Sequence, residues 1–175
     1  VFSAFITRVL RLLITIDAFA TRQSRIAEHM QACAQVLQAR LKAWYPKYIK
    51  SLPQAARNAV TRINIITGKM LGSKGNDKKI IKFKAAETRH FLTFAIELAE
   101  EFKDELSSVC DVENLIKAGQ CLQDWMAICG KHGRLLPPDV PLQLTNLMFE
   151  HNIAADKAGV KMLPKHHQAH SILFC

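Results

Sequence analysis

Residues 2–16 read FSAFITRVLRLLITI, and this stretch does most to decide the fold. Its apolar side chains recur at the three- and four-residue spacing of an α-helix, while Arg8, Arg11 and Thr15 share the opposite face. The apolar face is wide, so we expect this helix to be a core or interface element. The apolar positions are Phe2, Phe5, Ile6, Val9, Leu12, Leu13 and Ile16.

A narrower apolar stripe continues the helical pattern along residues 26–41. No glycine or proline occurs before Pro46, so residues 1–43 predict one long N-terminal helix or a pair of helices. Charged residues lie inside the apolar run, and no stretch of about 18 uncharged apolar residues exists in the chain. We therefore expect neither a membrane span nor a signal peptide.

Proline and glycine divide the middle of the chain. Pro46 disfavours helix at the residue before it, so we expect the first helical segment to stop at residues 44–46. A second helix is predicted from about residue 53 to residue 71. Residues 68–79 read GKMLGSKGNDKK and form the clearest loop, which is both basic and rich in glycine.

Three further helices are predicted within residues 84–158. The first covers about residues 84–106, and Asp111 can cap a second helix of residues 112–129. Asp139 can cap the last, which carries Pro141 in its first turn and ends before Gly159. Residues 160–175 are rich in histidine and form either a short strand or a final helix, because periodicity does not decide between them.

These patterns predict a single all-α domain of five to six helices over residues 1–175, with one short strand as an option near the C-terminus. The chain is long enough to bury a core, and its apolar fraction of 49% excludes a disordered polar tail. Seven glycines and six prolines are too few for a turn-rich β architecture.

Charge is distributed unevenly along the chain, whose formal net charge is +9. Residues 40–84 contain twelve Lys or Arg and a single acid, Asp77, whereas residues 87–113 are strongly acidic. This asymmetry predicts a folded molecule with a positive side, which suits an acidic partner such as nucleic acid or an anionic membrane surface. The residues expected to meet phosphates are Arg57, Arg62, Lys69, Lys74, Lys78, Lys79 and Lys82.

Trp44, Tyr45 and Tyr48 lie among these basic residues and allow two interpretations. Aromatic faces can stack on bases, which would add to nucleic-acid binding. They can equally seal the end of a helical hairpin while the lysines nearby stay solvated. We favour the sealing role for these three side chains.

No complete catalytic constellation is present, so the sequence favours a non-catalytic role, with no cofactor and no small-molecule substrate. His166 and His170 are four residues apart and could share a metal if their segment is helical, but the glutamate of a zinc-peptidase motif is absent. His151 is expected to be a hydrogen-bonded core residue. The five cysteines form no Cys-x-x-Cys pair, which is typical of reduced thiols in an intracellular compartment, the nucleus or the cytoplasm.

Four short motifs carry a resemblance to a known group of proteins. They are KAAETRH at residues 84–90, AGQCL at 118–122, LPP at 136–138 and LPKHHQAH at 163–170. Their order resembles uncharacterised mobile-element-derived proteins of unicellular algae. The last motif is also similar to a segment of cut-and-paste transposases of the RNase-H-like class.

The resemblance spans residues 84–170 and implies a helical region that precedes the last element of a transposase core. In such enzymes that element brings a catalytic glutamate, which the resemblance would place beyond Cys175. Asp17 and Asp77 do not lie in strand contexts, so the aspartates of such a core have no counterpart here.

Two functions follow as hypotheses. The leading one is a non-catalytic helical region of a mobile-element-derived, transposase-like protein that contacts nucleic acid electrostatically. The alternative is a structural or assembly subunit that docks on a partner protein or a membrane surface through the amphipathic helix of residues 2–16.

Overall fold

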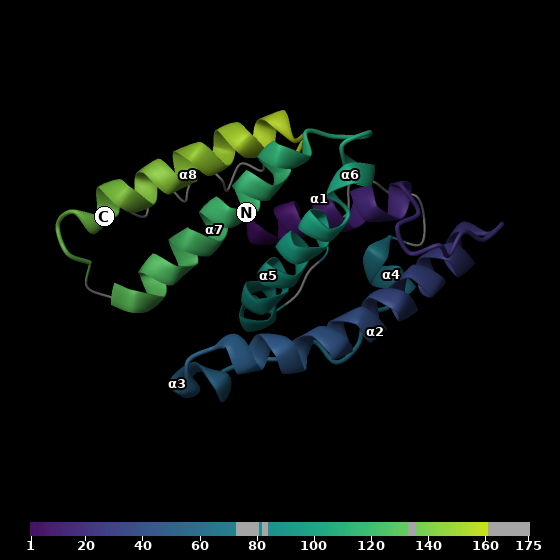
Figure 1. Ribbon diagram of the computed structural model, residues 1–175, viewed down its shortest axis with the longest axis horizontal. Helices are drawn as coiled ribbons and strands as arrows, with labels where there is room; N and C mark the ends of the chain where they lie inside the picture. Colours follow the sequence, from purple (N-terminus) through teal and green to yellow (C-terminus); the bar gives the residue numbers. More distant parts are fainter. Residues whose placement is uncertain (73–80, 82–83, 133–135, 161–175) are drawn as a thin grey trace.

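The computed structural model describes residues 1–72, 81, 84–132 and 136–160, and within them the protein is all-α as predicted. Five long helices form the framework, and three single-turn helices lie between them (Figure 1). The helices are α1 (Phe2–Thr15), α2 (Ile26–Ser51), α3 (Gln54–Arg57), α4 (Gly68–Leu71), α5 (Ala85–Glu101), α6 (Lys103–Leu106), α7 (Val112–His132) and α8 (Val140–Lys157). The short strand considered for residues 160–175 falls outside the described residues.

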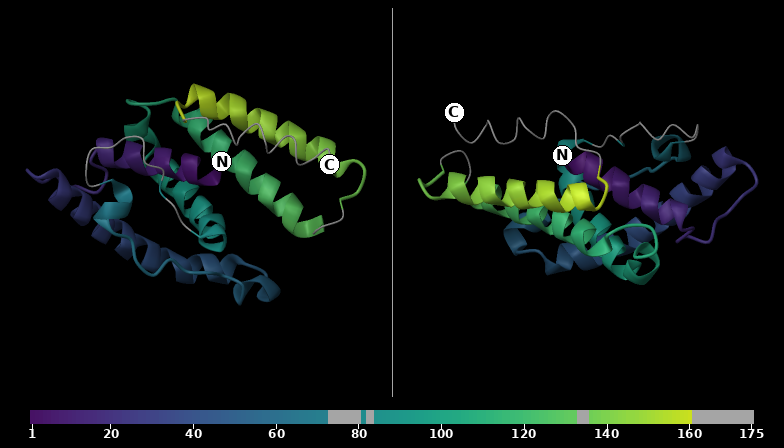
Figure 2. Two further views of the ribbon diagram at one scale, coloured as in Figure 1. Left: turned by 180° about the vertical axis from the view of Figure 1, so that it is seen from behind. Right: turned by 90° about the horizontal axis from the view of Figure 1, so that it is seen from above.

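The long helices are arranged in successive layers. α8 lies at one edge and packs on α7, α7 packs on α1 and α5, and α2 with α4 forms the opposite edge (Figures 1 and 2). α1 is central, and Phe5, Ile6, Val9 and Leu13 are fully buried within it. The wide apolar face of residues 2–16 is therefore a core element of this chain.

Residues 1–43 form a helix pair rather than one long helix. α1 ends at Thr15, and Asp17 and Ala20 then adopt left-handed backbone conformations with φ of 54° and 49°. The carboxylate of Asp17 accepts a hydrogen bond from the backbone N–H of Thr21 at 3.0 Å, which stabilises the turn. Since neither glycine nor proline marks this break, the sequence did not locate it.

The expected stop at residues 44–46 is wrong, because α2 continues through Pro46 to Ser51. Pro46 removes one helical hydrogen bond, but it is exposed, so the freed carbonyl faces solvent. Contacts on both sides hold the helix together. Trp44 donates to Glu97 at 2.6 Å, and the Tyr48 hydroxyl meets His90 Nδ1 at 3.0 Å.

The helix predicted for residues 53–71 is also wrong. Only the single turns α3 and α4 form, and residues 60–67 run extended between them. Six of these eight residues, VTRINIIT, are β-branched, and such side chains lose rotamer freedom in a helix. The loop expected at 68–79 begins with α4, and its residues from 73 onward lie outside the described part of the chain.

Side chains of α2 hold the extended segment through three hydrogen bonds. The backbone N–H of Ile63 donates to the Tyr45 hydroxyl at 2.8 Å and that of Ile66 to Gln38 Oε1 at 2.6 Å. The N–H of Gly68 donates to Gln31 Oε1 at 3.1 Å. The three acceptors are seven residues apart along α2, so they lie on one face, and the segment runs antiparallel to the helix.

The three later helices follow the sequence more closely. Asp111 caps α7 by accepting from the Asn114 N–H at 3.2 Å, and Gly159, with φ of 67°, ends α8. A Cβ on Gly119 would lie 2.6 Å from side-chain atoms of Phe5 and Ile96, so α7 packs closely against these two side chains. His151 is fully buried, and its Nδ1 lies 2.9 Å from the Ala118 carbonyl oxygen, which confirms its core role.

Candidate nucleic-acid interface

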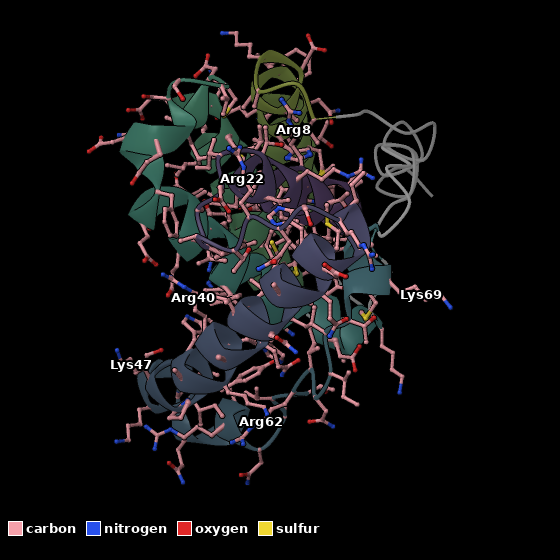
Figure 3. All side chains as sticks on the ribbon, turned by 90° about the vertical axis from the view of Figure 1, so that its right-hand side faces the viewer. Arg8, Arg22, Arg40, Lys47, Arg62 and Lys69 are labelled. Carbon is pink, nitrogen blue, oxygen red and sulfur yellow. The ribbon has the colours of Figure 1, made fainter. Side chains whose placement is uncertain are left out.

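Positive charge gathers where α2 ends, around α3 and the start of the extended segment. We call this region the basic end, and Figure 3 shows two of its members, Lys47 and Arg62, at the lower end of α2. Its exposed side chains, together with the half-buried Arg57, have no ion-pair partner among the described residues. The basic end comprises Lys42, Lys47, Lys50, Arg57 and Arg62.

The outer face of α2 adds no negative charge to this region. Glu28 is the only acid in the sequence of α2, and it lies in the first turn, at the far end of the helix. Lys42, Lys47 and Lys50 are exposed, because Trp44, Tyr45 and Leu41 occupy the buried face. A polyanion could therefore approach the last two turns of α2 without meeting a carboxylate of that helix.

Arg62 is exposed on the extended segment and lies over a ring of α2. Its guanidinium carbon is 5.9 Å from the centroid of the Tyr45 ring, which is a cation–π geometry. Tyr45 in turn accepts the hydrogen bond of Ile63, so the same side chain orders the backbone that carries Arg62. This contact holds a cationic group at the surface while leaving its charge available.

Arg57 has a structural task that the sequence did not reveal. Its Nε donates to the Leu52 carbonyl at 3.0 Å, and its Nη2 donates to the Lys50 carbonyl at 3.1 Å. These carbonyls lie at the C-terminal end of α2, where cations are favoured by the helix dipole. Arg57 therefore closes the turn between α2 and α3, and part of its hydrogen-bonding capacity is already used.

Lys69 does not join the basic end. It is exposed on α4, which packs beside the N-terminal half of α2, and Figure 3 shows it at the opposite edge of the view from Lys47. The remaining predicted contacts, Lys74, Lys78, Lys79 and Lys82, lie outside the described residues. Of the seven predicted residues, the structure thus brings Arg57 and Arg62 together, and adds Lys42, Lys47 and Lys50 to them.

The aromatic residues near the basic end are packed, as the favoured interpretation predicted. Trp44 and Tyr45 are buried, and the Tyr48 ring stacks on Trp44 with centroids 4.3 Å apart. Burial raises the pKa of both tyrosines. These rings seal α2 against Phe94 and His90 of α5, so they are not free to stack on bases.

Negative charge gathers at the other end of α5. α2 and α5 run antiparallel, and where they diverge Arg40 pairs with Glu101 through bonds of 2.8 and 2.9 Å. Beyond this pair, exposed acids occupy the end of α5, α6 and the start of α7, opposite α3 in Figure 1. We call this the acidic end, and it comprises Glu100, Glu101, Asp104, Glu105 and Glu113.

A shallow polar groove at the acidic end was not predicted from the sequence. Lys103, Lys117 and Glu100 contribute to its lining, and its lysines are paired, Lys103 with Glu113 and Lys117 with Glu150. The pairing raises the pKa of Lys103 through its contact with Glu113. The mixed charges largely neutralise one another, so this groove does not resemble an anion site.

Metal chemistry finds no support within the part of the chain that the structure describes. No group of three or more His, Cys, Asp or Glu side chains could hold a metal ion there. The candidate ligands His166 and His170 lie outside the described residues. Burial raises the pKa of the Cys33, Cys110, Cys121 and Cys129 thiols, which disfavours the reactive thiolate.

Comparison of the chain with protein-family models, curated proteins and solved structures gives no match. No described helix is long and apolar enough to cross a membrane.

Proposed function

We propose that this protein binds nucleic acid electrostatically and without sequence preference through its basic end. The observation that carries the proposal is the set of exposed cations at the end of α2 that have no ion-pair partner among the described residues. A surface cation that is paired with a carboxylate is already neutralised in part and attracts a phosphate weakly. An unpaired cation can neutralise a phosphate and so release a counterion from the nucleic acid.

The layout of charge supports an oriented encounter with a polyanion. α5 runs from the basic end to the acidic end, so the acids beyond Glu101 lie away from Lys47, Lys50 and Arg62 (Figure 1). Lys42 is nearer to the acids, because Arg40, two residues before it, pairs with Glu101. A polyanion is repelled by one end and attracted by the other, and the molecule therefore presents α3 and the end of α2 to it.

Binding to a fluorescent DNA duplex, measured across a salt series, tests the proposal. Each phosphate contact contributes about 0.9 to the slope of log affinity against log salt concentration. The variant K42Q/K47Q/K50Q/R62Q should bind at least tenfold more weakly near 100 mM salt, with a slope shallower by up to about 3.6. Arg57 is left intact because it closes the turn after α2.

A matched control removes four positive charges elsewhere. Arg25, Lys103, Lys117 and Lys131 are exposed and lie outside the basic end, so the variant R25Q/K103Q/K117Q/K131Q has the same net charge as the test variant. It should retain most of the affinity and the slope of the unaltered protein. Equal losses in both variants would show that net charge alone, and not the basic end, governs binding.

The alternative function requires residues 2–16 to dock on a partner or a membrane surface. Their apolar face is buried between α5 and α7, and Arg8 donates to the Ala158 carbonyl at the end of α8 at 3.3 Å. Docking through α1 would require the bundle to open. Flotation with anionic vesicles tests this, since binding that depends on Leu10 or Leu13 would favour the alternative over nucleic acid.

The mobile-element origin is a separate part of the proposal and rests on the resemblance of residues 84–170. It is tested by the sequence that follows Cys175 in the gene. An in-frame strand with an acidic residue supports a transposase-like parent, whereas a stop codon favours a binding or assembly protein that acts alone.

A further inference from the structure

The outer face of α8 carries a stripe of large apolar side chains. Leu142, Phe149 and Ile153 are 66%, 60% and 44% exposed. These three residues are half of the exposed large apolar side chains that the structure describes. They are separated by seven and four residues, so they lie on one face of the helix. We call this set the α8 stripe.

The α8 stripe is additional to the face that holds α8 in the fold. Leu144, Met148, His151 and Ala155 are buried and pack α8 on α7. At 3.6 residues per turn these positions lie on the side of the helix opposite the α8 stripe. α8 forms one edge of the described part of the chain in Figures 1 and 2, so the stripe faces away from the other described helices. An apolar face of this kind marks an interaction surface.

The charged residues beside the α8 stripe indicate which partner surface is complementary to it. Asp139 and Lys157 are exposed and flank the stripe on the same side, one at each end of α8. When two such helices pair antiparallel about a two-fold axis, each residue on that flank meets a residue of the same flank of the other copy. Asp139 of one copy then lies within one residue's rise of Lys157 of the other, at both ends of the pair.

The apolar positions match in the same register. Leu142 of one copy meets Ile153 of the other. Phe149 of one copy lies level with Asn146 of the other, and Asn146 is exposed on the same face of α8, between Leu142 and Phe149. A polar residue inside an apolar seam favours one register over its neighbours.

We propose that the α8 stripe is the contact surface for a second copy of this chain, which forms an antiparallel α8–α8 pair. Three apolar side chains per copy cover less than the roughly 800 Å² per partner of a standard interface, so the pair is reversible. α2 and the basic end lie on the side of the molecule away from α8 (Figure 1). Pairing therefore leaves them accessible, and the proposal does not depend on nucleic-acid binding.

Sedimentation equilibrium over a concentration series, from about micromolar to millimolar, measures the pairing. The average mass of the protein should rise toward twice that of one chain. Phe149→Glu should weaken the dimer at least tenfold, because it places two carboxylates in the centre of the seam. Ile65→Glu is the matched control, since Ile65 is 69% exposed on the extended segment, and it should leave the dimer unchanged.

A charge exchange tests the antiparallel register itself. Asp139→Lys should weaken the dimer by placing like charges at both ends of the seam, and Lys157→Asp should do the same. The double variant D139K/K157D should restore it. Circular dichroism checks that each variant keeps its helix content, since Asp139 precedes the first turn of α8 and Lys157 contributes to the field at Asp111.

Three results would overturn the proposal. One is a mass that stays at that of a single chain at the highest concentration. The second is a dimer that Phe149→Glu does not weaken, which would place the contact elsewhere. The third is a dimer that Phe149→Glu weakens but that the double variant D139K/K157D does not restore, which would exclude this register.

Discussion

Gly68 and Gly130 both lie in helices, yet a methyl group added to each would meet different surroundings. A Cβ on Gly68 would lie 2.7 Å from the backbone nitrogen of Gln31 and 2.9 Å from the backbone carbon of Met30. On Gly130 the nearest atom would be the end of the Arg89 side chain, at 3.2 Å. Backbone atoms cannot move aside, whereas a flexible guanidinium can.

Gly68→Ala should therefore destabilise the fold, by about 1–3 kcal/mol, because α4 must move away from α2. Gly130→Ala should be neutral or stabilising by up to about 1 kcal/mol, because glycine is a poor residue inside a helix. Chemical denaturation of both variants measures the difference. Equal effects would contradict the close approach of α4 to α2.

His90 links stability to pH. Burial lowers the pKa of His90, and the neighbouring Arg89 adds to the effect, while the Ala59 carbonyl opposes it. The imidazole is therefore held neutral between α2 and α5, where its Nδ1 meets the Tyr48 hydroxyl. The position of His90 in the sequence of α5 does not by itself reveal what packs on it.

Because the pKa of His90 is lower in the folded state, the unfolded chain takes up this proton first as pH falls. The contribution of His90 is complete above its ordinary pKa of 6.5 and is lost as pH falls through that value toward the folded pKa. His90→Asn should make the unfolding free energy less dependent on pH between about 7.5 and 5. An unchanged pH dependence in urea titrations would contradict this assignment.

At the scale of the elements, local sequence signals predicted the later helices closely but did not predict the path of the chain after Pro46. Asp111 and Gly159 are a cap and a stop that can be read directly from the sequence. Asp139 holds the N-cap position of α8 but makes no side-chain cap hydrogen bond, so its predicted capping bond is wrong although α8 begins where expected. The path after Pro46 depends instead on contacts between distant residues. Three side chains of α2 accept hydrogen bonds from backbone N–H groups about twenty to forty residues further along the chain, namely Tyr45, Gln38 and Gln31. No local sequence pattern indicates such a distant partner.

Tyr45→Phe tests this hydrogen-bonded arrangement. Removing the hydroxyl leaves the N–H of Ile63 buried without its acceptor, which should cost about 1–3 kcal/mol. Hydrogen exchange should show faster exchange at Ile63, with smaller effects at Ile66 and Gly68. Tyr48→Phe is the control, because its hydroxyl meets His90 rather than the extended segment. Equal exchange at Ile63 in both variants would argue against the role of Tyr45.

At the scale of the whole molecule, the sequence predicted a positive side but not its composition. The charge runs of residues 40–84 and 87–113 are visible in one dimension. The pairing of Arg40 with Glu101, the structural use of Arg57 and the separation of Lys69 depend on how the helices pack. The α8 stripe was missed for a related reason, since apolar residues on two faces of one helix obscure the usual single-sided pattern.

The separation of the basic end from the acidic end also gives the described part of the chain an electric dipole moment along α5. The oppositely charged ends of two molecules attract one another head to tail, and a contact between unlike surfaces can add further molecules wherever it does not close into a ring. The net charge of +9 opposes this attraction, so we expect turbidity only in concentrated protein at very low ionic strength, and we expect it to clear when salt is added, which is salting-in behaviour.

Light scattering during a sodium chloride titration measures this effect. K42Q/K47Q/K50Q/R62Q should stay clear where the unaltered protein is turbid, because it loses the positive end of the dipole. Phe149→Glu should still become turbid, since the stripe on α8 is not involved. Turbidity that is insensitive to salt would indicate apolar aggregation instead. A protein with this charge layout would thus be most soluble near physiological salt, where screening over about 8 Å suppresses the attraction between ends.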